Sequence, residues 1–487
     1  MRKLILAIDQ GTSSSRVILF DLDGEIVHKF QRELKCSYPQ NTWVEQDANL
    51  IWQDCYAMCL EAIHYAASNN CDIHSMGITN QRETVVFFDK QSQQALAPAI
   101  VWQDRRTDDF CKKLIENGHS DRVRQRSGLI IDAYFSASKI NWGLSHIEAV
   151  QQAHRQQRLA VGTIDSWLLF KLSGGKLHAT DSSNASRTML FDIVKHKWCD
   201  DLLELFDVPL EILPRVLNSI DDYGSTAVDL FPTVLPINAL IGDQQSATIG
   251  QGCLSIGDSR CTLGTGSFAM HNLGTKFSLN DGGLLTTILF SHNDVITYAS
   301  EGSVFSSGST LQWLRDSLNI LDTASDSERI ARSIDDSGGV YFVPAFSGLG
   351  SPHWQPQARA MLCGMSSKTT KNEIVRAALE SVSYQCHDLF AHLTPQELKI
   401  DGGMAANDWL LQNIADILGC DILRPANIEA TAWGAARCAG ESLGLLKPSS
   451  DGTINYDRFR PLMSLAERKR LIDGWHAAVS SCINHNV

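Results

Sequence analysis

The sequence of 487 residues contains no apolar run of the ~18 to 20 residues that a helix needs to cross a bilayer. Its first apolar stretch, residues 4–8, ends at Asp9 and is too short and too polar for a signal peptide. We therefore expect no membrane insertion and a cytoplasmic protein. Runs rich in Lys and Arg are also missing, and 42 Lys and Arg against 55 Asp and Glu give a net charge of −13. We therefore expect no nucleic-acid partner.

A CxxC pair is lacking too, although the chain has 13 cysteines. The closest two, Cys55 and Cys59, have helical spacing. Scattered single cysteines indicate buried, reduced thiols in a reducing compartment rather than a disulfide or a metal site. There is no low-complexity segment and no short-period repeat. With 44% hydrophobic and 20% charged residues the composition is that of a globular protein. At ~150 residues per domain, the length predicts two to four domains.

The apolar pattern of the first part of the chain predicts three strands, a helix and then further strands. The helix begins near Ile51, because apolar residues recur from there at i, i+3, i+4 and i+7. The expected strands cover residues 4–8, 16–21, 25–34, 73–79 and 85–89. This order differs from a strict strand–helix alternation. It is typical of the actin-like nucleotide-binding core, which opens with a β-hairpin around phosphate.

The second half repeats this opening. Residues 259–263 and 268–271 are strand-like, and Gly264-Thr265-Gly266-Ser267 forms a small-residue turn between them. We therefore predict an α/β fold of two related, actin-like (ribonuclease H-like) domains facing each other, residues 1–250 and 251–487. Helices are expected over residues 305–317, 373–393, 408–418 and 431–442. The last is dense in Ala and Gly, which makes sense only if another segment packs close to its backbone.

The first turn, Asp9-Gln10-Gly11-Thr12-Ser13-Ser14-Ser15-Arg16, has the composition of a phosphate cradle. Gly11 lets the backbone approach an oxyanion, and turn amides and hydroxyls donate to phosphate oxygens. Asp9 is placed to hold a hydrated Mg²⁺, and Arg16 supplies a cation. The alternative is a polar hairpin turn with a solvated arginine.

The turn at Gly264 is a candidate for a second cradle, and the segment from Lys399 to Asn407 for a third. In the third, Gly402 and Gly403 follow an expected strand, and they would let a flat purine or a ribose lie against the backbone. Asn407 would be a polar contact. A helix C-cap or an ordinary strand-to-helix turn explains the same residues equally well.

Polar and aromatic side chains follow several apolar strands, where α/β sheets commonly bind ligands. They are Arg82, Glu83, Trp102, Tyr134, Asp243 and Gln244. Adjacent Arg and Glu side chains suit the hydroxyls of a small polyol, and Trp102 and Phe268 suit its carbon face. The alternative for Arg82 and Glu83 is a surface ion pair of little energetic value.

Asp243 is the sharpest candidate, because phosphoryl transfer needs positioning, charge neutralisation and one carboxylate to accept the hydroxyl proton. It follows an apolar stretch and Gly242, just before the expected domain boundary. A helix N-cap would look the same in the sequence.

These segments together resemble the FGGY family of carbohydrate kinases, from about Lys3 to about Phe459. The resemblance rests on motifs that occur in the family's order: IDQGTSSSR, ITNQRET, VWQDRRT, YFSASK, GTIDSWL, NASRTMLF, GDQQSA, LGTGSF, LQWLRD, VPAFSGLGSP and DGGMAAN. The QRE, WQDRR and YFS segments point to the branch that phosphorylates glycerol rather than xylulose or ribulose. His353 and Gln355 depart from the Tyr and Asp of many relatives.

The resemblance implies an ATP-binding cleft between the domains and the reaction of Mg-ATP with glycerol, giving sn-glycerol 3-phosphate and ADP. Asp243 would be the base. Further residues are carried over by motif: for glycerol, Arg82, Glu83, Trp102, Tyr134, Gln244 and Phe268; for ATP, Thr12, Ser13, Ser14, Arg16, Thr265, Gly308, Gln312, Gly403 and Asn407; for the metal, Asp9. A homo-oligomer, dimer or tetramer, is also implied. Open alternatives are a family member acting on another polyol or ketose, and an actin-like nucleotide sensor.

Overall fold

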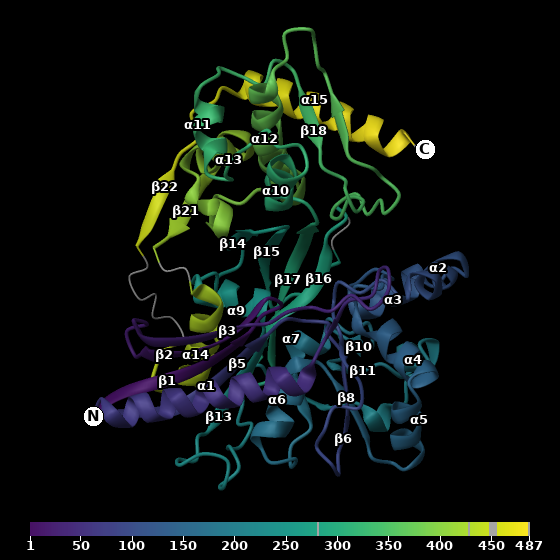
Figure 1. The fold of residues 1–487 in the computed structure, drawn as a ribbon, viewed down its shortest axis with the longest axis vertical. Helices are drawn as coiled ribbons and strands as arrows, with labels where there is room; N and C mark the ends of the chain where they lie inside the picture. Colours follow the sequence, from purple (N-terminus) through teal and green to yellow (C-terminus); the bar gives the residue numbers. More distant parts are fainter. Residues whose placement is uncertain (280–281, 427–428, 448–454, 486–487) are drawn as a thin grey trace.

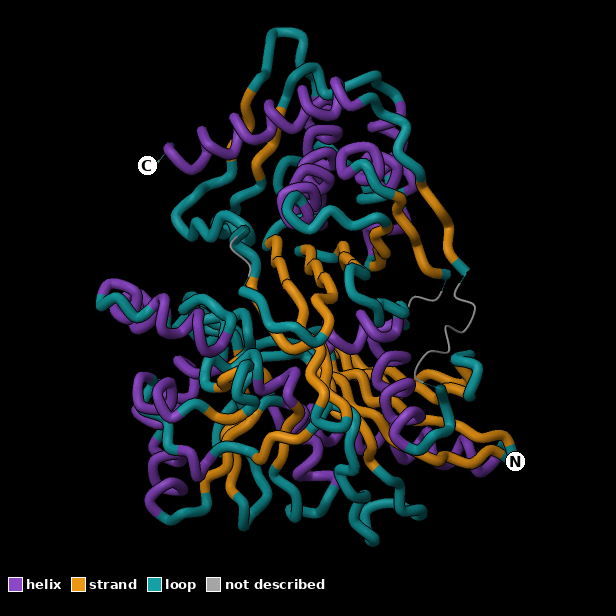
Figure 2. The backbone as a smooth tube through the Cα atoms, turned by 180° about the vertical axis from the view of Figure 1, so that it is seen from behind, coloured by secondary structure: helices purple, strands orange, loops and turns teal. Residues whose placement is uncertain are grey.

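The computed structural model describes residues 1–279, 282–426, 429–447 and 455–485. Two large mixed sheets lie one above the other along the longest axis of the molecule (Figure 1). The N-terminal half of the chain forms the lower part and most of the C-terminal half forms the upper part. Seen from behind, the strands of both sheets converge at the centre of the molecule (Figure 2). Among the described residues, no helix is both long and apolar enough to cross a membrane.

The lower sheet has five strands in the order β13-β5-β1-β2-β3. Its strands are β1 (Arg2–Gln10), β2 (Ser14–Asp21), β3 (Ile26–Glu33), β5 (Cys71–Asn80) and β13 (Ile237–Gly242). The first three are antiparallel, whereas β5 and β13 run parallel to β1. Helix α1 (Ala48–Ser68) joins β3 to β5, with the Asp47 carboxylate as its N-cap. This confirms the predicted order of three strands, helix and strand.

Five strands of the upper sheet repeat the arrangement of the lower sheet. The strands of the upper sheet are β14 (Ser259–Leu263), β15 (Ser267–Gly274), β16 (Leu285–His292), β17 (Val295–Val304), β20 (Glu397–Asp401), β21 (Asp421–Pro425) and β22 (Tyr456–Phe459). The run β17-β15-β14-β20-β21 matches β3-β2-β1-β5-β13 in both position and direction. The two glycine turns predicted to be equivalent therefore occupy equivalent places, between the first and second strands of each sheet.

Helix α14 (Ala430–Ser442) crosses from the upper part and packs on the lower sheet, beside α9 (Asp243–Gly250) (Figure 1). Its small residues are required there. A Cβ added to Gly434 would collide with the Ser246 carbonyl of α9, and one added to Gly77 of β5 would collide with the Ala435 carbonyl of α14. The prediction that something packs close to this helix backbone is confirmed. The helix joins the two halves of the molecule.

The remaining elements surround the two sheets. Short strand pairs are β4 (Glu45–Gln46) with β7 (Ala99–Ile100), β6 (Val86–Asp89) with β8 (Leu159–Gly162), β9 (Ala179–Asp181) with β12 (Arg215–Leu217), β10 (Phe191–Asp192) with β11 (Lys197–Trp198), and β18 (Tyr341–Val343) with β19 (Met361–Cys363). Further helices are α2 (Asp108–Glu116), α3 (Ser120–Ser127), α4 (Ser136–His146), α5 (Glu148–Arg155), α6 (Ile164–Leu172), α7 (Ser182–Ala185), α8 (Asp200–Leu205), α10 (Gly308–Asp316), α11 (Asp326–Arg332), α12 (Lys371–Phe390), α13 (Asp408–Leu418) and α15 (Leu465–Asn484).

One local prediction is corrected. The helix expected from Phe305 begins only at Gly308, because Ser307 has φ −127° and ψ −89°, outside the helical region. The strand expected over residues 85–89 is confirmed as β6, which pairs with β8 in a separate two-stranded sheet. Strand pairing over such sequence distances leaves no local signal in the sequence.

Candidate active site

Three parallel strands end together at one edge of the lower sheet. Gln10 of β1 and Gly242 of β13 are both in register with Asn80 of β5. The residues around these strand ends, Asp9, Arg82 and Asp243, are therefore brought together although they are far apart in the sequence. This edge faces the upper sheet, and it is where parallel α/β sheets commonly bind ligands.

Arg82 lies at the centre of a buried charge network. Its Nη1 and Nη2 atoms donate to the Glu301 carboxylate at 2.6 and 3.0 Å, and its Nε lies 3.2 Å from Asp243 Oδ1. Arg187 Nε donates to Glu83 at 2.7 Å, and Arg187 Nη2 donates to Glu301 at 3.0 Å. The Arg82 and Glu83 side chains are each 2% exposed, which excludes a surface ion pair.

This network holds Glu83 in a strained backbone conformation. Glu83 has φ +60°, a region that side chains other than glycine rarely adopt, and such strain costs about 1–3 kcal/mol. Burial alone would raise the pKa of Glu301, but Arg187 and Arg82 hold it below its ordinary value. Burial raises the pKa of Glu83, and both arginines oppose this shift. Glu301 is therefore the fixed anion of the network.

Asp243 is the first residue of α9, and Gly242 is the N-cap. Asp243 Oδ1 accepts a hydrogen bond from its neighbour Gln244 N at 2.7 Å and faces Arg82. The N-cap explanation of this residue is therefore wrong. The side chain is 28% exposed, so it lies at the border of the buried network. Burial raises its pKa above the ordinary value, and Arg82 opposes that shift.

Aromatic rings form one wall of the site. The Trp102 ring packs edge-on against Tyr134, with centroids 5.6 Å apart, and against Phe268 at 6.3 Å. Trp102 and Tyr134 come from the lower part of the chain and Phe268 from β15 of the upper sheet. Trp102 Nε1 also donates to Thr12 Oγ1 at 2.9 Å, which ties the aromatic wall to the first glycine turn.

The two glycine turns open into one cavity of about 1370 Å³. Each turn closes on itself, with Gly11 N donating to Ser14 O and Gly264 N to Gly266 O, both at 2.9 Å. The predicted site residues that line the cavity are Thr12, Ser13, Trp102, Tyr134, Gln244, Thr265 and Phe268. The structure thus brings both candidate phosphate turns and the candidate polyol wall into a single space. Ser14 is buried in β2, next to the first turn.

Arg16 and Asp9 lie beneath the first turn. Arg16 Nη1 is 3.5 Å from Asp9 Oδ2 and 3.2 Å from Glu429 Oε2, so the guanidinium is held by carboxylates. Asp9 is 6% exposed, and burial raises the pKa of its carboxyl to about 7. Water solvates the ionised form of this buried carboxylate poorly, so a nearby cation would stabilise it. Its place next to a phosphate turn suits a hydrated Mg²⁺. The residues therefore fit this ion.

The remaining residues predicted for ATP lie in α10 and in the segment that leads from β20 into α13. Gly308 begins α10, and its N–H donates to Gly264 O of the second turn at 2.9 Å. Gln312 is exposed one turn later. A Cβ added to Gly403 would meet no atom within 4 Å, so this backbone faces open space. Asn407 caps α13 by accepting from Leu410 N at 2.9 Å. These four residues do not line the described cavity.

Sequence reasoning missed Arg187 and Glu301 as members of the site. Arg187 follows the short helix α7, and Glu301 lies in the middle of the buried strand β17. Both side chains are 0% exposed. A glutamate within a strand of small and apolar residues was the one available signal, because a buried carboxylate needs a cation partner.

Models of known families match almost the whole chain. The N-terminal domain of the FGGY family of carbohydrate kinases matches residues 4–250, and its C-terminal domain matches residues 260–443. The glycerol kinase of Rhodospirillum rubrum is 44% identical over 98% of both chains. That of Coxiella burnetii is 45% identical over 99% of this chain and 98% of its own.

A solved structure gives the same result. The crystal structure of Plasmodium falciparum glycerol kinase with ADP superposes with a TM-score of 0.93 at 32% identity, covering 99% of this chain and 98% of that chain. The fold, the paired glycine turns and the full-length similarity agree, and this chain belongs to the FGGY family of carbohydrate kinases.

Proposed function

We infer that this protein transfers the γ-phosphoryl group of ATP to glycerol, giving sn-glycerol 3-phosphate and ADP. One observation carries the inference from geometry: a single cavity is lined by both glycine turns, by the aromatic wall and by Gln244, the residue next to Asp243. The relatives that are 44–45% identical over nearly their whole length are glycerol kinases, which selects glycerol among the substrates of the family.

We propose Asp243 as the general base. Both of its contacts, to Arg82 and to Gln244 N, use Oδ1. Within the described part of the chain this leaves Oδ2 for the hydroxyl of glycerol. A carboxylate within hydrogen-bond reach accepts the proton as the new bond to phosphorus forms. Arg82 keeps this carboxylate ionised and oriented.

Arg82 and Glu83 would bind glycerol through the hydrogen-bonding groups that have no partner within the charge network. Arg82 has four contacts, to Asp243, Gln245 and twice to Glu301, which use four of its five N–H groups. One Nη2 N–H remains as a donor to a hydroxyl. Glu83 is bonded through Oε1 to Arg187, so Oε2 is left as an acceptor. Trp102, Tyr134 and Phe268 would cover the carbon face, and Gln244 would contact a further hydroxyl.

The two turns would hold the phosphates of ATP. Thr12, Ser13, Ser14 and Arg16 act from the lower sheet, and Thr265 acts from the upper sheet. Gly308, Gln312, Gly403 and Asn407 would hold the adenosine. Asp9 would hold Mg²⁺, which neutralises charge on the phosphates when bound. We propose the two parts of the chain, residues 1–250 and 251–487, as domains that close over the cleft to exclude water.

The proposed function is tested by ADP formation from Mg-ATP over a panel of acceptors. The panel is glycerol, dihydroxyacetone, erythritol, xylulose, ribulose and no acceptor. We expect a strong signal with glycerol and little without acceptor. Activity confined to a ketose would keep the fold and the base but overturn the assigned glycerol pocket. ADP formation that is independent of every acceptor would favour a nucleotide sensor.

We also propose a homo-oligomer, which light scattering on the same protein tests. A molar mass equal to that of one chain would contradict it.

A further inference from the structure

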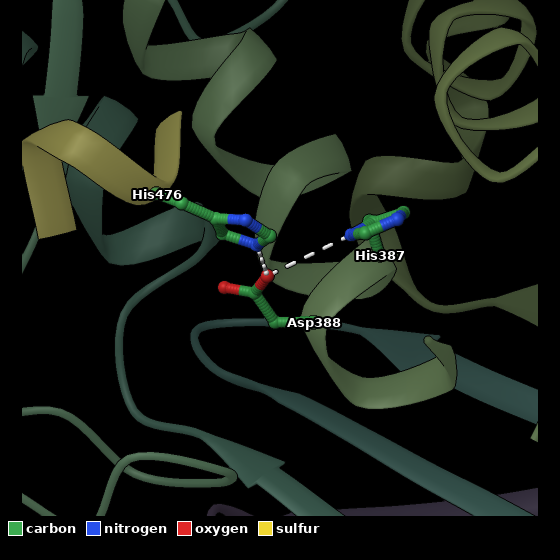
Figure 3. A group of neighbouring side chains, drawn as sticks. All are labelled: His387, Asp388 and His476. Carbon is green, nitrogen blue, oxygen red and sulfur yellow. Dashed lines mark hydrogen bonds and ion pairs between the residues drawn. The ribbon is translucent and has the colours of Figure 1, made fainter. Parts of the chain in front are cut away.

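A cluster of three histidines surrounds one buried carboxylate outside the active site. Asp388 lies in the last turns of α12, and its side chain is 5% exposed. His387 precedes it on the same helix, His476 comes from α15, and His353 comes from the loop before β19. Figure 3 shows His387 and His476 approaching the Asp388 carboxylate from the two helices. Neither the proposed reaction nor the aromatic wall uses these residues.

The two oxygens of Asp388 have different partners. Oδ2 accepts a hydrogen bond from Trp475 Nε1 at 2.8 Å and lies 3.3 Å from His353 Nε2. Oδ1 faces His476 Nε2 at 3.0 Å and His387 Nδ1 at 3.7 Å. The last distance is too long for a hydrogen bond. His387 Nδ1 is a buried atom with no hydrogen-bond partner among the described residues.

We propose that His387, Asp388 and His476 form a binding site for a divalent transition-metal ion, with Zn²⁺ as the best fit. Their three ligand atoms lie within 4.8 Å of one another. Ligands of a tetrahedral Zn²⁺ with bonds near 2.0–2.1 Å are about 3.3 Å apart, and the observed 3.0 and 3.7 Å lie on either side of that value. Two imidazoles and one carboxylate suit Zn²⁺, whereas Mg²⁺ and Ca²⁺ prefer oxygen ligands alone.

The surroundings of the cluster provide support and access. Trp475 and His353 fix the carboxylate through Oδ2, as outer partners of metal ligands commonly do. The His476 side chain is 50% exposed, so an ion and a water as fourth ligand reach the site from solvent. The bound ion would join α15 to α12. Through His353 it would also support the loop that carries Leu349 and Trp354 to the wall of the active-site cavity.

The test uses the full chain, stripped of metal and free of nucleotide. Zn²⁺ is titrated against a chelating indicator, and bound zinc is counted by mass spectrometry. We expect one Zn²⁺ per chain and a higher Tm with Zn²⁺ than without. The double variant His387→Ala/His476→Ala should bind roughly tenfold more weakly or worse. The control variant His392→Ala, at an exposed histidine just beyond α12, should bind as the parent does.

Zinc binding that is equally tight in the double variant and the parent would overturn the proposal, because the two proteins differ only in the two proposed histidine ligands. So would a parent protein that binds no zinc. If circular dichroism shows that the double variant is misfolded, the proposal is tested on the parent alone, by its zinc stoichiometry and by the modification of His476. Carbethoxylation of the half-exposed His476, mapped by mass spectrometry, should be slowed several-fold by Zn²⁺, and an unchanged rate would contradict the site.

Discussion

The two oxygens of the Asp243 carboxylate have different roles: Oδ1 contacts Arg82 and the Gln244 amide, and we propose Oδ2 as the acceptor of the glycerol proton. Asp243→Asn keeps the size of the side chain and removes the basic oxygen. We expect kcat to fall by about 10²–10⁴-fold with ATP binding largely retained. The control Asp229→Asn removes a carboxylate from an exposed loop and should leave kcat unchanged. Near-normal turnover of Asp243→Asn would remove this residue from its proposed role.

Glu301 holds two buried arginines, and its substitution tests the network that sequence reasoning missed. Glu301→Gln leaves Arg82 and Arg187 short of one negative charge in the interior. We expect a loss of about 3 kcal/mol in the free energy of unfolding, measured by urea denaturation, and a raised KM for glycerol. Glu116→Gln, in an exposed pair with Lys112, is the matched control and should be nearly neutral. If both variants are equally stable, Glu301 does not stabilise the fold through its ion pairs with Arg82 and Arg187.

At the scale of the elements, the contact of α14 with α9 connects packing to catalysis. Gly434→Ala places a Cβ against the backbone of α9, the helix that begins with Asp243. We expect a loss of about 1–3 kcal/mol in stability, with a lower kcat because α9 must shift. Gly440→Ala on the same helix has the same intrinsic gain in helix propensity, but the atoms nearest to its Cβ belong to the side chains of Ile5 and Leu446, which can move more easily than backbone. If Gly434→Ala is no worse than Gly440→Ala, the helices are not as closely packed as described.

A second prediction concerns the junction of β8 with the segment before β9. There His178 Nε2 lies 3.1 Å from Val161 O, and burial lowers the pKa of His178 to about 4. In the unfolded chain the pKa is about 6.5. Between these values the unfolded state binds a proton that the folded state does not, so stability falls as the pH drops from about 6.5 to 4. The loss at pH 5 is at most about 2 kcal/mol.

Urea denaturation of His178→Gln at pH 7.5 and pH 5 measures this contribution. The variant should lose less stability than the parent between the two pH values. His392→Gln removes an exposed histidine and serves as the control. A parent-like loss in His178→Gln would assign the acid sensitivity to other groups.

At the scale of the whole molecule, the sequence predicted those features that a short segment determines by itself, such as turns and the strands beside them. The turns at Gly11 and Gly264 and their flanking strands indicated two related halves, and the matching strand order and direction of the two mixed sheets agree. The sequence could not predict that Arg187 and Glu301 pair across more than 100 residues, or that α14 lies on the lower sheet. Such contacts are set by packing in three dimensions and leave no local pattern in the sequence. For the predicted site residues, the family resemblance supplied the assignment to a common site that local patterns could not.

The most direct test of the central claim is the stoichiometry of the reaction with Mg-ATP and glycerol. ADP is measured by one coupled assay, and sn-glycerol 3-phosphate by a stereospecific dehydrogenase that oxidises it. We expect one sn-glycerol 3-phosphate for each ADP, and neither product when glycerol is omitted. ADP formed without sn-glycerol 3-phosphate would contradict phosphoryl transfer to glycerol in the cavity between the two sheets.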